Sequence, residues 1–122
     1  MGYTKKTLDN KSFIGYIIYM RVRKTNIYTK WIKNLTDSRA KNKIRIRVKR
    51  LAGGNPGDVV PVGEGISEMR IHYGPGYRVY YKDTGMEIVI LLCGGNKSTQ
   101  QEDIARAKHL ASLPLAELKL ED

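Results

Sequence analysis

The segment "EIVILLC" (87–93) constrains the fold more than any other part of the chain. Its residues are apolar at both odd and even positions, a pattern typical of a central strand that is covered on both faces. We therefore expect a sheet with this segment in its interior and other strands beside it.

Four other segments have the alternation or composition of strands. In "IGYIIYMRV" (14–22) the apolar side chains share one parity, which predicts a strand before the first helix. In "VVPVG" (59–63) the proline restricts the segment to a sheet edge, because Pro61 has no N–H to donate. The remaining two are "ISEMRIHY" (66–73) and "YRVYYKD" (77–83).

Two segments between these strands predict helices. In residues 26–35 the apolar side chains fall on one helical face, with Asn26 as a candidate N-cap; they are Tyr28, Trp31, Ile32 and Leu35. Residues 37–51 are ambiguous, because "IRIRVKR" (44–50) alternates as a strand would. A helical apolar stripe, the length and the absence of Gly and Pro favour a helix there, capped by Thr36 or Asp37.

A third helix is expected over residues 98–113, where Thr99 and Glu102 have the spacing of a capping box. The order is strand, two helices, three or four strands and a helix, so we predict one α+β domain over residues 1–122 with a mostly antiparallel sheet. Residues 1–12 are expected to be loose, and the tail 114–122 is open between a further turn and disorder.

The charge of the chain indicates the kind of partner. Lys and Arg number 22 against 12 acidic residues, a net charge of +10 with a pI near 9.8. Such a protein attracts polyanions: RNA, DNA, an acidic lipid surface or an acidic protein. No segment reaches the roughly 20 apolar residues of a membrane span, so we expect a soluble, cytoplasmic protein without a membrane partner.

Catalysis by metal or by a nucleophilic triad has little support in the sequence. Cys93 is the single cysteine and the two histidines are scattered, which makes neither a disulfide framework nor a zinc pattern. No Ser-His-Asp set or pair of catalytic carboxylates is visible. Any chemistry is therefore expected to use cations, tyrosine and one histidine, with no cofactor and no metal.

The run "MRIHYGPGYRVYYKDTG" (69–85) predicts a hairpin turning at Gly74-Pro75-Gly76. If Tyr73 lies opposite Tyr77, the polar face pairs His72 with Arg78, Arg70 with Tyr80 and Glu68 with Lys82. Directly opposed side chains lie about 5 Å apart at Cβ and diagonal ones about 7–8 Å, so the two arginines would be diagonal neighbours.

Two arginines held this close repel each other, and an anion between them would relax that repulsion. Phosphate accepts paired hydrogen bonds from guanidinium groups, and Tyr or His can stack on an unstacked base. The hairpin is thus a candidate anion site with an aromatic shelf. The alternative is a solvated outer sheet face whose arginines lie over tyrosine rings.

Two further basic segments are candidates for contacts with phosphate. "CGGNKSTQ" (93–100) places Lys97 between a strand and a helix start, where anions bind. On the helix over 37–51, Arg39, Lys43, Arg47 and Arg50 share one side. That stripe is equally well explained as a solvated face.

The phrases "GDVVPVGEGISEMRI", "YGPGYRVYY" and "LLCGGNKSTQ" together resemble the RelE/ParE superfamily of toxins from type II toxin–antitoxin systems. The similarity covers about residues 26–112 and is strongest to the HigB-like addiction-module killer proteins. It implies a RelE-like fold: two N-terminal helices packed on a twisted, mostly antiparallel sheet of four or five strands, with a C-terminal helix. It also decides residues 44–50 in favour of helix.

The resemblance implies a metal-independent mRNA endoribonuclease that blocks translation, either on the ribosome or free. Arg70 and Arg78 match basic strand positions of the family and would bind phosphate. His72 or Tyr80 would move protons. Further contacts with RNA phosphate would come from Lys97, Lys82, Lys49, Arg50 and Arg47. The implied partners are mRNA, the ribosome, and an acidic antitoxin with a helix-turn-helix, as in HigA-like proteins.

The chain departs from RelE, which has a tyrosine near its C-terminus, because the last tyrosine here is Tyr81. It also lacks the C-terminal histidine cluster of some HigB proteins. Two alternatives therefore stay open: a ParE-like toxin that inhibits DNA gyrase without cutting RNA, and a non-toxic basic module that binds nucleic acid.

Overall fold

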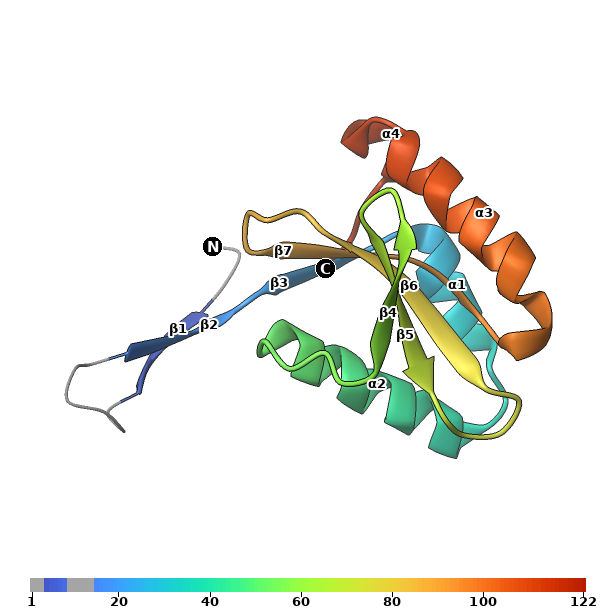
Figure 1. The fold of residues 1–122 in the computed structure, drawn as a ribbon, viewed down its shortest axis with the longest axis horizontal. Helices are drawn as coiled ribbons and strands as arrows, with labels where there is room; N and C mark the ends of the chain where they lie inside the picture. The colour runs from blue at the N-terminus through green and yellow to red at the C-terminus, as the bar shows by residue number, and fades with distance from the viewer. Residues whose placement is uncertain (1–3, 9–14) are drawn as a thin grey trace.

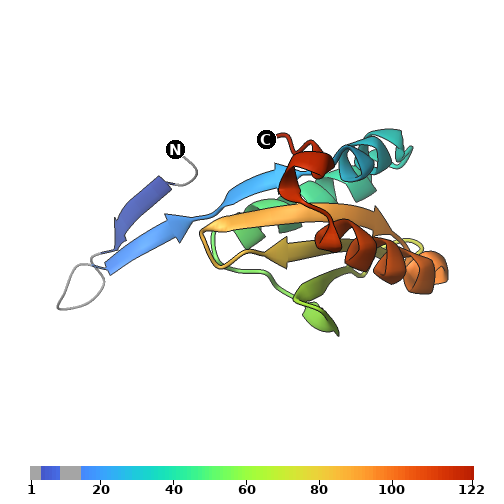
Figure 2. The same cartoon turned by 90° about the horizontal axis from the view of Figure 1, so that it is seen from above.

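The computed structural model describes residues 4–8 and 15–122 (Figure 1). The first two strands, β1 (Thr4–Leu8) and β2 (Gly15–Tyr19), form an antiparallel pair of their own. This pair extends away from the rest of the molecule in two perpendicular views (Figures 1 and 2). Within the segment 1–12, which was expected to be loose, Thr4–Leu8 form the strand β1. The rest of that segment lies outside the described residues.

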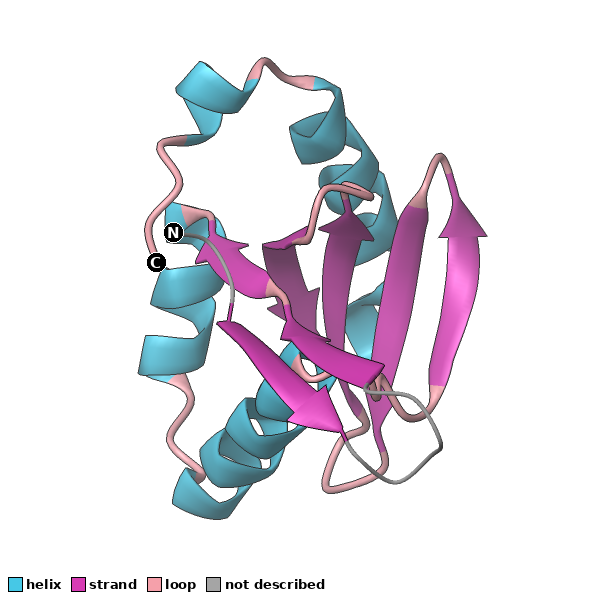
Figure 3. Cartoon of the chain, turned by 90° about the vertical axis from the view of Figure 1, so that its left-hand side faces the viewer, coloured by secondary structure: helices cyan, strands magenta, loops and turns pink. Residues whose placement is uncertain are grey.

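The main sheet has five strands in the order β3-β7-β6-β5-β4. It lies among the helices (Figure 3). Three of its pairings are antiparallel, whereas β3 runs parallel to β7, so the sheet is mixed. Its strands are β3 (Arg21–Lys24), β4 (Val59–Gly63), β5 (Ile66–Ile71), β6 (Tyr77–Asp83) and β7 (Ile88–Gly95).

Two predictions about strand positions are confirmed. The apolar run lies in β7, between β3 and β6, and is buried along almost its whole length. The segment with Pro61 is the edge strand β4, which pairs with β5 alone. The expected single strand over 14–22 is instead two strands, β2 and β3, separated at Met20.

Four α-helices are described: α1 (Asn26–Asn34), α2 (Ser38–Ala52), α3 (Gln100–Ser112) and the short α4 (Leu115–Leu118). Residues 44–50 are helical, as expected, and Asp37 caps α2 by accepting hydrogen bonds from two backbone N–H groups. Strands precede α1, so the two first helices are not N-terminal. In the described parts of the chain, no helix has the length and apolar content needed to cross a membrane.

Two expected caps are wrong. The N-cap of α1 is Thr25, whose hydroxyl accepts from the backbone N–H of Tyr28, so Asn26 is already inside the helix. The capping box before α3 pairs Asn96 with Thr99 and caps the N-terminus of the 3₁₀ turn η1 (Lys97–Thr99). The Thr99 hydroxyl donates to Asp103 instead of capping α3.

Helices cover both faces of the sheet. One core cluster joins side chains of α1 and α2 to the face that carries Met69, Val79 and Leu91. A second cluster joins α3 and α4 to the opposite face, where Tyr80 and Leu92 lie. The burial of β7 on both sides follows directly from this arrangement.

The C-terminal tail is folded against β3 (Figure 1). Glu121 exchanges two backbone hydrogen bonds with Lys24, and the Asp122 carboxylate accepts from Arg21. For residues 114–122 the alternatives were a further turn or disorder. The structure has a further helical turn there, α4.

Candidate functional site

The hairpin of β5 and β6 has a different register from the one assumed. Arg70 lies directly opposite Arg78, and Glu68 lies opposite Tyr80. The difference arises at the turn, because His72 and the glycine-proline segment lie outside the ladder, which begins at Ile71. A shift by two residues keeps every side chain on its predicted face, so both arginines share one face, and they are closer than expected.

The carboxylate of Glu68 is the centre of this face. Glu68 is fully buried, and its Oε1 accepts a hydrogen bond of 2.8 Å from Arg70 Nε. Its Oε2 accepts from the Tyr80 hydroxyl at 2.9 Å and from Gln100 Nε2 at 2.9 Å. Arg78 Nε lies 3.6 Å from the same oxygen. One carboxylate therefore faces two guanidinium groups, which leaves one net positive charge.

These contacts decide the protonation states. Burial raises the pKa of Glu68, but hydrogen bonds from Arg70, Gln100 and Tyr80 outweigh it and hold that pKa below its ordinary value. The hydrogen bond to Glu68 also raises the pKa of Arg70. At neutral pH the cluster is a carboxylate between two permanent cations.

The two arginines differ in access to solvent. The Arg70 side chain is 34% exposed, whereas that of Arg78 is 10% exposed. Arg78 Nη1 donates a hydrogen bond of 2.7 Å to the Gly76 carbonyl, and its Nε has no hydrogen-bond partner. Arg70 can thus reach a ligand directly, while Arg78 contributes its charge from beneath.

Tyr80 does not form the expected aromatic shelf. It is fully buried, because α3 and α4 pack over this face of the sheet. Burial and then the hydrogen bond to Glu68 raise the pKa of Tyr80 far above its ordinary value. Its hydroxyl therefore holds Glu68 in place and cannot contact a base or exchange protons with an exposed substrate.

A basic cleft of about 640 Å³ opens above this cluster. Its lining is the hairpin from 70 to 78 together with Lys97 and Gln100, so the structure brings Arg70, Arg78, His72 and Lys97 to one place. The backbone N–H of Lys97 donates to the Pro75 carbonyl, which ties η1 to the hairpin turn. Gly76 is left-handed, with φ at 80°, and a Cβ there would lie 3.2 Å from Arg78 Nη1.

His72 is an exposed imidazole in the lining of the cleft. Its side chain is 74% exposed, and its Nε2 is hydrogen bonded to Asp58 Oδ2. This bond from His72 holds the pKa of Asp58 below its ordinary value. A carboxylate on one ring nitrogen orients the imidazole and leaves the other nitrogen to exchange protons.

A second hollow of about 370 Å³ adjoins the basic cleft and shares Ile71, His72 and Tyr73 with it. Lys43 and Arg50 of α2 line this side hollow, and Lys43 Nζ lies 5.1 Å from the centre of the Tyr73 ring. Positive charge therefore continues from the cleft along α2. Of the predicted contacts on this helix, Arg50 is well placed to extend the site.

Three residues that were predicted to contact RNA either lie outside the basic cleft and the side hollow or already donate hydrogen bonds to the protein. Arg47 donates hydrogen bonds to the carbonyls of Arg70, Pro56 and Asp58, so its guanidinium holds the loop before β4. Lys82 lies near the far end of β6, in a hollow beside α4. Lys49 is exposed on α2 but lines neither the cleft nor the side hollow.

Metal and thiol chemistry have no support in the geometry. Within residues 4–8 and 15–122, no three His, Cys, Asp or Glu side chains are grouped so that they could hold a metal ion. Cys93 is buried, and burial raises the pKa of its thiol to about 12. A thiol of this kind stays neutral and does not act as a nucleophile.

Sequence reasoning missed Asp58, Gln100 and the role of Glu68. Glu68 has the same parity as Arg70 in one alternating strand, which is a detectable signal for an ion pair along that face. Asp58 and Gln100 come from a loop and a helix, so no local spacing indicates that they meet the hairpin.

The chain was compared with known families, proteins and structures. No family model matches it, and no solved structure matches it. An uncharacterized protein of Haemophilus influenzae is 50% identical over 92 residues, which are 75% of this chain and 93% of that protein. The chain therefore belongs to the same family as this Haemophilus influenzae protein.

Proposed function

We propose that this protein is a toxin of the RelE/ParE type, with a RelE-like arrangement of its α+β fold, and that it acts on RNA. One observation carries the proposal: Arg70, Arg78, His72 and Lys97 converge in a single cleft on a chain of net charge +10. Cations grouped along an open cleft are the arrangement that recognises a nucleic-acid backbone.

The residues of the cleft have distinct roles in this proposal. Arg70 and Lys97, which reach solvent, bind the phosphate, and Arg78 adds charge from beneath. In the reaction, the ribose 2′-oxygen attacks the adjacent phosphorus, its bond to phosphorus forms, and the bond to the 5′-oxygen breaks. The guanidinium groups stabilise the extra negative charge of the phosphorane.

His72 is the proposed proton-transfer group. As a neutral ring it takes the proton of the 2′-hydroxyl while water protonates the departing 5′-oxygen, or as a cation it protonates that oxygen while water takes the hydroxyl proton. Asp58 is a positioning residue, because its carboxylate holds the ring at Nε2. This assignment replaces Tyr80, whose burial removes it from the reaction.

Two partners complete the proposal. An acidic antitoxin, of the kind that carries a helix-turn-helix, would cover the basic cleft and neutralise the toxin. Charge complementarity would make this association fast and sensitive to salt. The substrate would be mRNA, on the ribosome or free, which places the activity in the cytoplasm.

Inducible expression with mapping of transcript 5′ ends tests the function. The wild-type protein is expected to arrest growth and create new 5′ ends. Arg70→Ala is expected to abolish both effects, because Arg70 is the exposed arginine of the cleft. Arg39→Ala is the matched control, since Arg39 is exposed on α2 and lies outside both hollows.

Growth arrest without new transcript ends would contradict the nuclease. Full toxicity of Arg70→Ala would contradict the site. Arg78→Ala is a less suitable variant, because Arg78 is itself buried. Arg70 also donates a hydrogen bond to the buried Glu68, so thermal melting must show that Arg70→Ala is folded.

Toxicity without RNA cleavage is the second candidate, and the cluster around Glu68 favours it. That carboxylate already neutralises part of the charge of both arginines, and Tyr80 is buried. A ParE-like inhibitor of DNA gyrase would lower plasmid supercoiling and leave mRNA intact. A supercoiling assay on the same cells therefore separates the two candidates.

A further inference from the structure

A second feature of the molecule is built around the single tryptophan of the chain. Trp31 of α1 packs against β7 at Gly94, where an added Cβ would lie 2.3 Å from Trp31 Cε3. The Tyr28 and Tyr77 rings lie 5.8 Å and 6.4 Å from the Trp31 ring, centre to centre. These contacts fix the indole while part of it stays at the surface.

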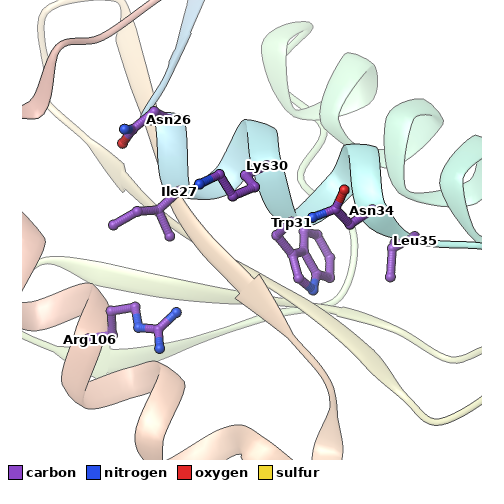
Figure 4. A pocket seen from close by; sticks show the side chains of 7 residues that line it. All are labelled: Asn26, Ile27, Lys30, Trp31, Asn34, Leu35 and Arg106. Carbon is purple, nitrogen blue, oxygen red and sulfur yellow. The ribbon is translucent and has the colours of Figure 1, made fainter.

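This exposed part of Trp31 lines an open groove of about 440 Å³ between α1 and α3 (Figure 4). Ile27 and Trp31 of α1, with its C-cap residue Leu35, follow one another at intervals of four residues and give this groove an apolar wall. Asn26 and Asn34 lie beside them and offer amide groups to a ligand. The groove thus combines an apolar wall with hydrogen-bonding groups.

The charged residues of this α1–α3 groove are all basic. Lys30 of α1 and Arg106 of α3 line it, and among the described lining residues none is acidic. Both cations are exposed, and within residues 19–122 neither forms an ion pair. Among the residues that the structure describes, the groove shares no lining residue with the basic cleft.

We propose that the α1–α3 groove binds an acidic amphipathic segment of a partner protein. A large apolar side chain of that segment packs against Trp31, and its carboxylates pair with Lys30 and Arg106. A rigid, partly exposed tryptophan within a polar rim is the composition of an energetic hot spot at protein interfaces. The basic rim selects acidic partners and disfavours basic ones.

The apolar side chains that line the α1–α3 groove favour a peptide over RNA as its ligand. Aliphatic side chains from Ile27 and Leu35 make up much of the apolar wall, and they match apolar side chains better than charged phosphate. RNA binding relies mainly on cations along a backbone track, and such a track lies instead at the basic cleft and the side hollow. RNA is therefore the competing occupant that the experiment must exclude.

Trp31 makes the groove directly observable, because its emission is the only tryptophan signal of the chain. The probe is a synthetic helical peptide with Glu along one side and Leu along the other, titrated into the full chain. We expect the emission of Trp31 to change with peptide concentration and to reach saturation. A peptide with Lys in place of every Glu, and one with Ser in place of every Leu, are expected to bind about tenfold more weakly or less.

Charge-reversed variants then locate the peptide. The double variant Lys30→Glu, Arg106→Glu is expected to weaken binding about tenfold. Arg39→Glu reverses the charge of one exposed residue of α2, away from the groove, and is expected to leave binding unchanged. Circular dichroism and thermal melting confirm that each variant is folded.

Three results would overturn the proposal. One is equal binding of the peptide to the groove variant and to wild type. Another is loss of binding in Arg70→Ala, which would put the peptide in the basic cleft. The third is an RNA oligonucleotide that changes Trp31 emission and loses this effect in the groove variant.

Discussion

Glu68 connects four side chains of the candidate site through its single carboxylate. It is wholly buried, yet it accepts hydrogen bonds from Arg70, Tyr80 and Gln100 and faces Arg78. A buried carboxylate is tolerated only when cations and donors replace water around it. Glu68 therefore fixes the two guanidinium groups at the base of the cleft, and stability and function depend on the same contacts.

Replacing Glu68 with Gln is expected to lower the free energy of unfolding at neutral pH by about 2 kcal/mol, because Arg78 loses its anion. The difference from wild type should shrink in acid. The pKa of Glu68 lies below its ordinary value of 4.5, so its stabilisation is complete above that pH and is lost as the pH falls through the lowered pKa. Denaturant titrations at a series of pH values measure both effects.

Glu64→Gln is the matched control for that series. Glu64 is exposed and pairs with Lys108 at 3.5 Å, so its replacement should change stability by less than about 0.5 kcal/mol. A Glu68→Gln variant that is as stable as wild type at neutral pH, or a difference that grows in acid, would refute the role assigned to this carboxylate.

At the scale of elements, β7 and α1 depend on the absence of a side chain at Gly94. The Trp31 ring occupies the space that a Cβ would take, so the helix lies close to the strand. The contact supports both hollows, because Trp31 lines the α1–α3 groove and packs on Tyr77, which lines the basic cleft. One backbone position thus determines how closely α1 approaches the sheet.

Gly94→Ala is expected to destabilise the protein by about 2 kcal/mol, because Trp31 must move to make room. The emission of Trp31 should shift to longer wavelength as the ring becomes more exposed. Gly53→Ala is the control, since a Cβ there meets nothing nearer than 3.5 Å and its φ is −83°. If the two alanine variants had equal stability and unchanged emission, the close contact of α1 with β7 would be disproved.

At the scale of the whole molecule, the positive net charge and the position of the basic residues both favour binding of a polyanion. The net charge is +10, and the basic cleft and side hollow form a continuous track through the residues that they share, 71–73. A field of this sign would attract an RNA strand from a distance, and in the proposed function Arg70, Lys97 and Arg50 would then contact its phosphates. Much of the affinity should therefore come from release of counterions.

Arg70→Ala is expected to reduce the slope of log affinity against log salt by about 0.7 for a single-stranded RNA, the contribution of one phosphate contact. Fluorescence anisotropy at several salt concentrations gives this slope. Arg39→Ala removes the same charge outside the track and should leave the slope unaltered. Equal slopes for the Arg70 and Arg39 variants would mean that the RNA does not lie in the cleft.

The sequence alone was enough to predict most elements and the face on which the arginines lie. Residues 44–50 were assigned to a helix correctly, and the apolar run in β7 was recognised as an interior strand. Arg70 and Arg78 share a face because side chains alternate along a strand, and a register shift of two residues preserves that alternation. Local periodicity carries the information for the strands and their faces. For residues 44–50, which alternate as a strand would, the length of the segment and the absence of Gly and Pro favour the helix.

Contacts between distant parts of the chain determine the remaining features. The length of the hairpin turn sets the register, α3 covers Tyr80, and Gln100 meets Glu68 across 32 positions of sequence. The α1–α3 groove likewise joins Trp31 to Arg106. None of these follows from spacing along the chain, because each depends on how the helices pack on the sheet.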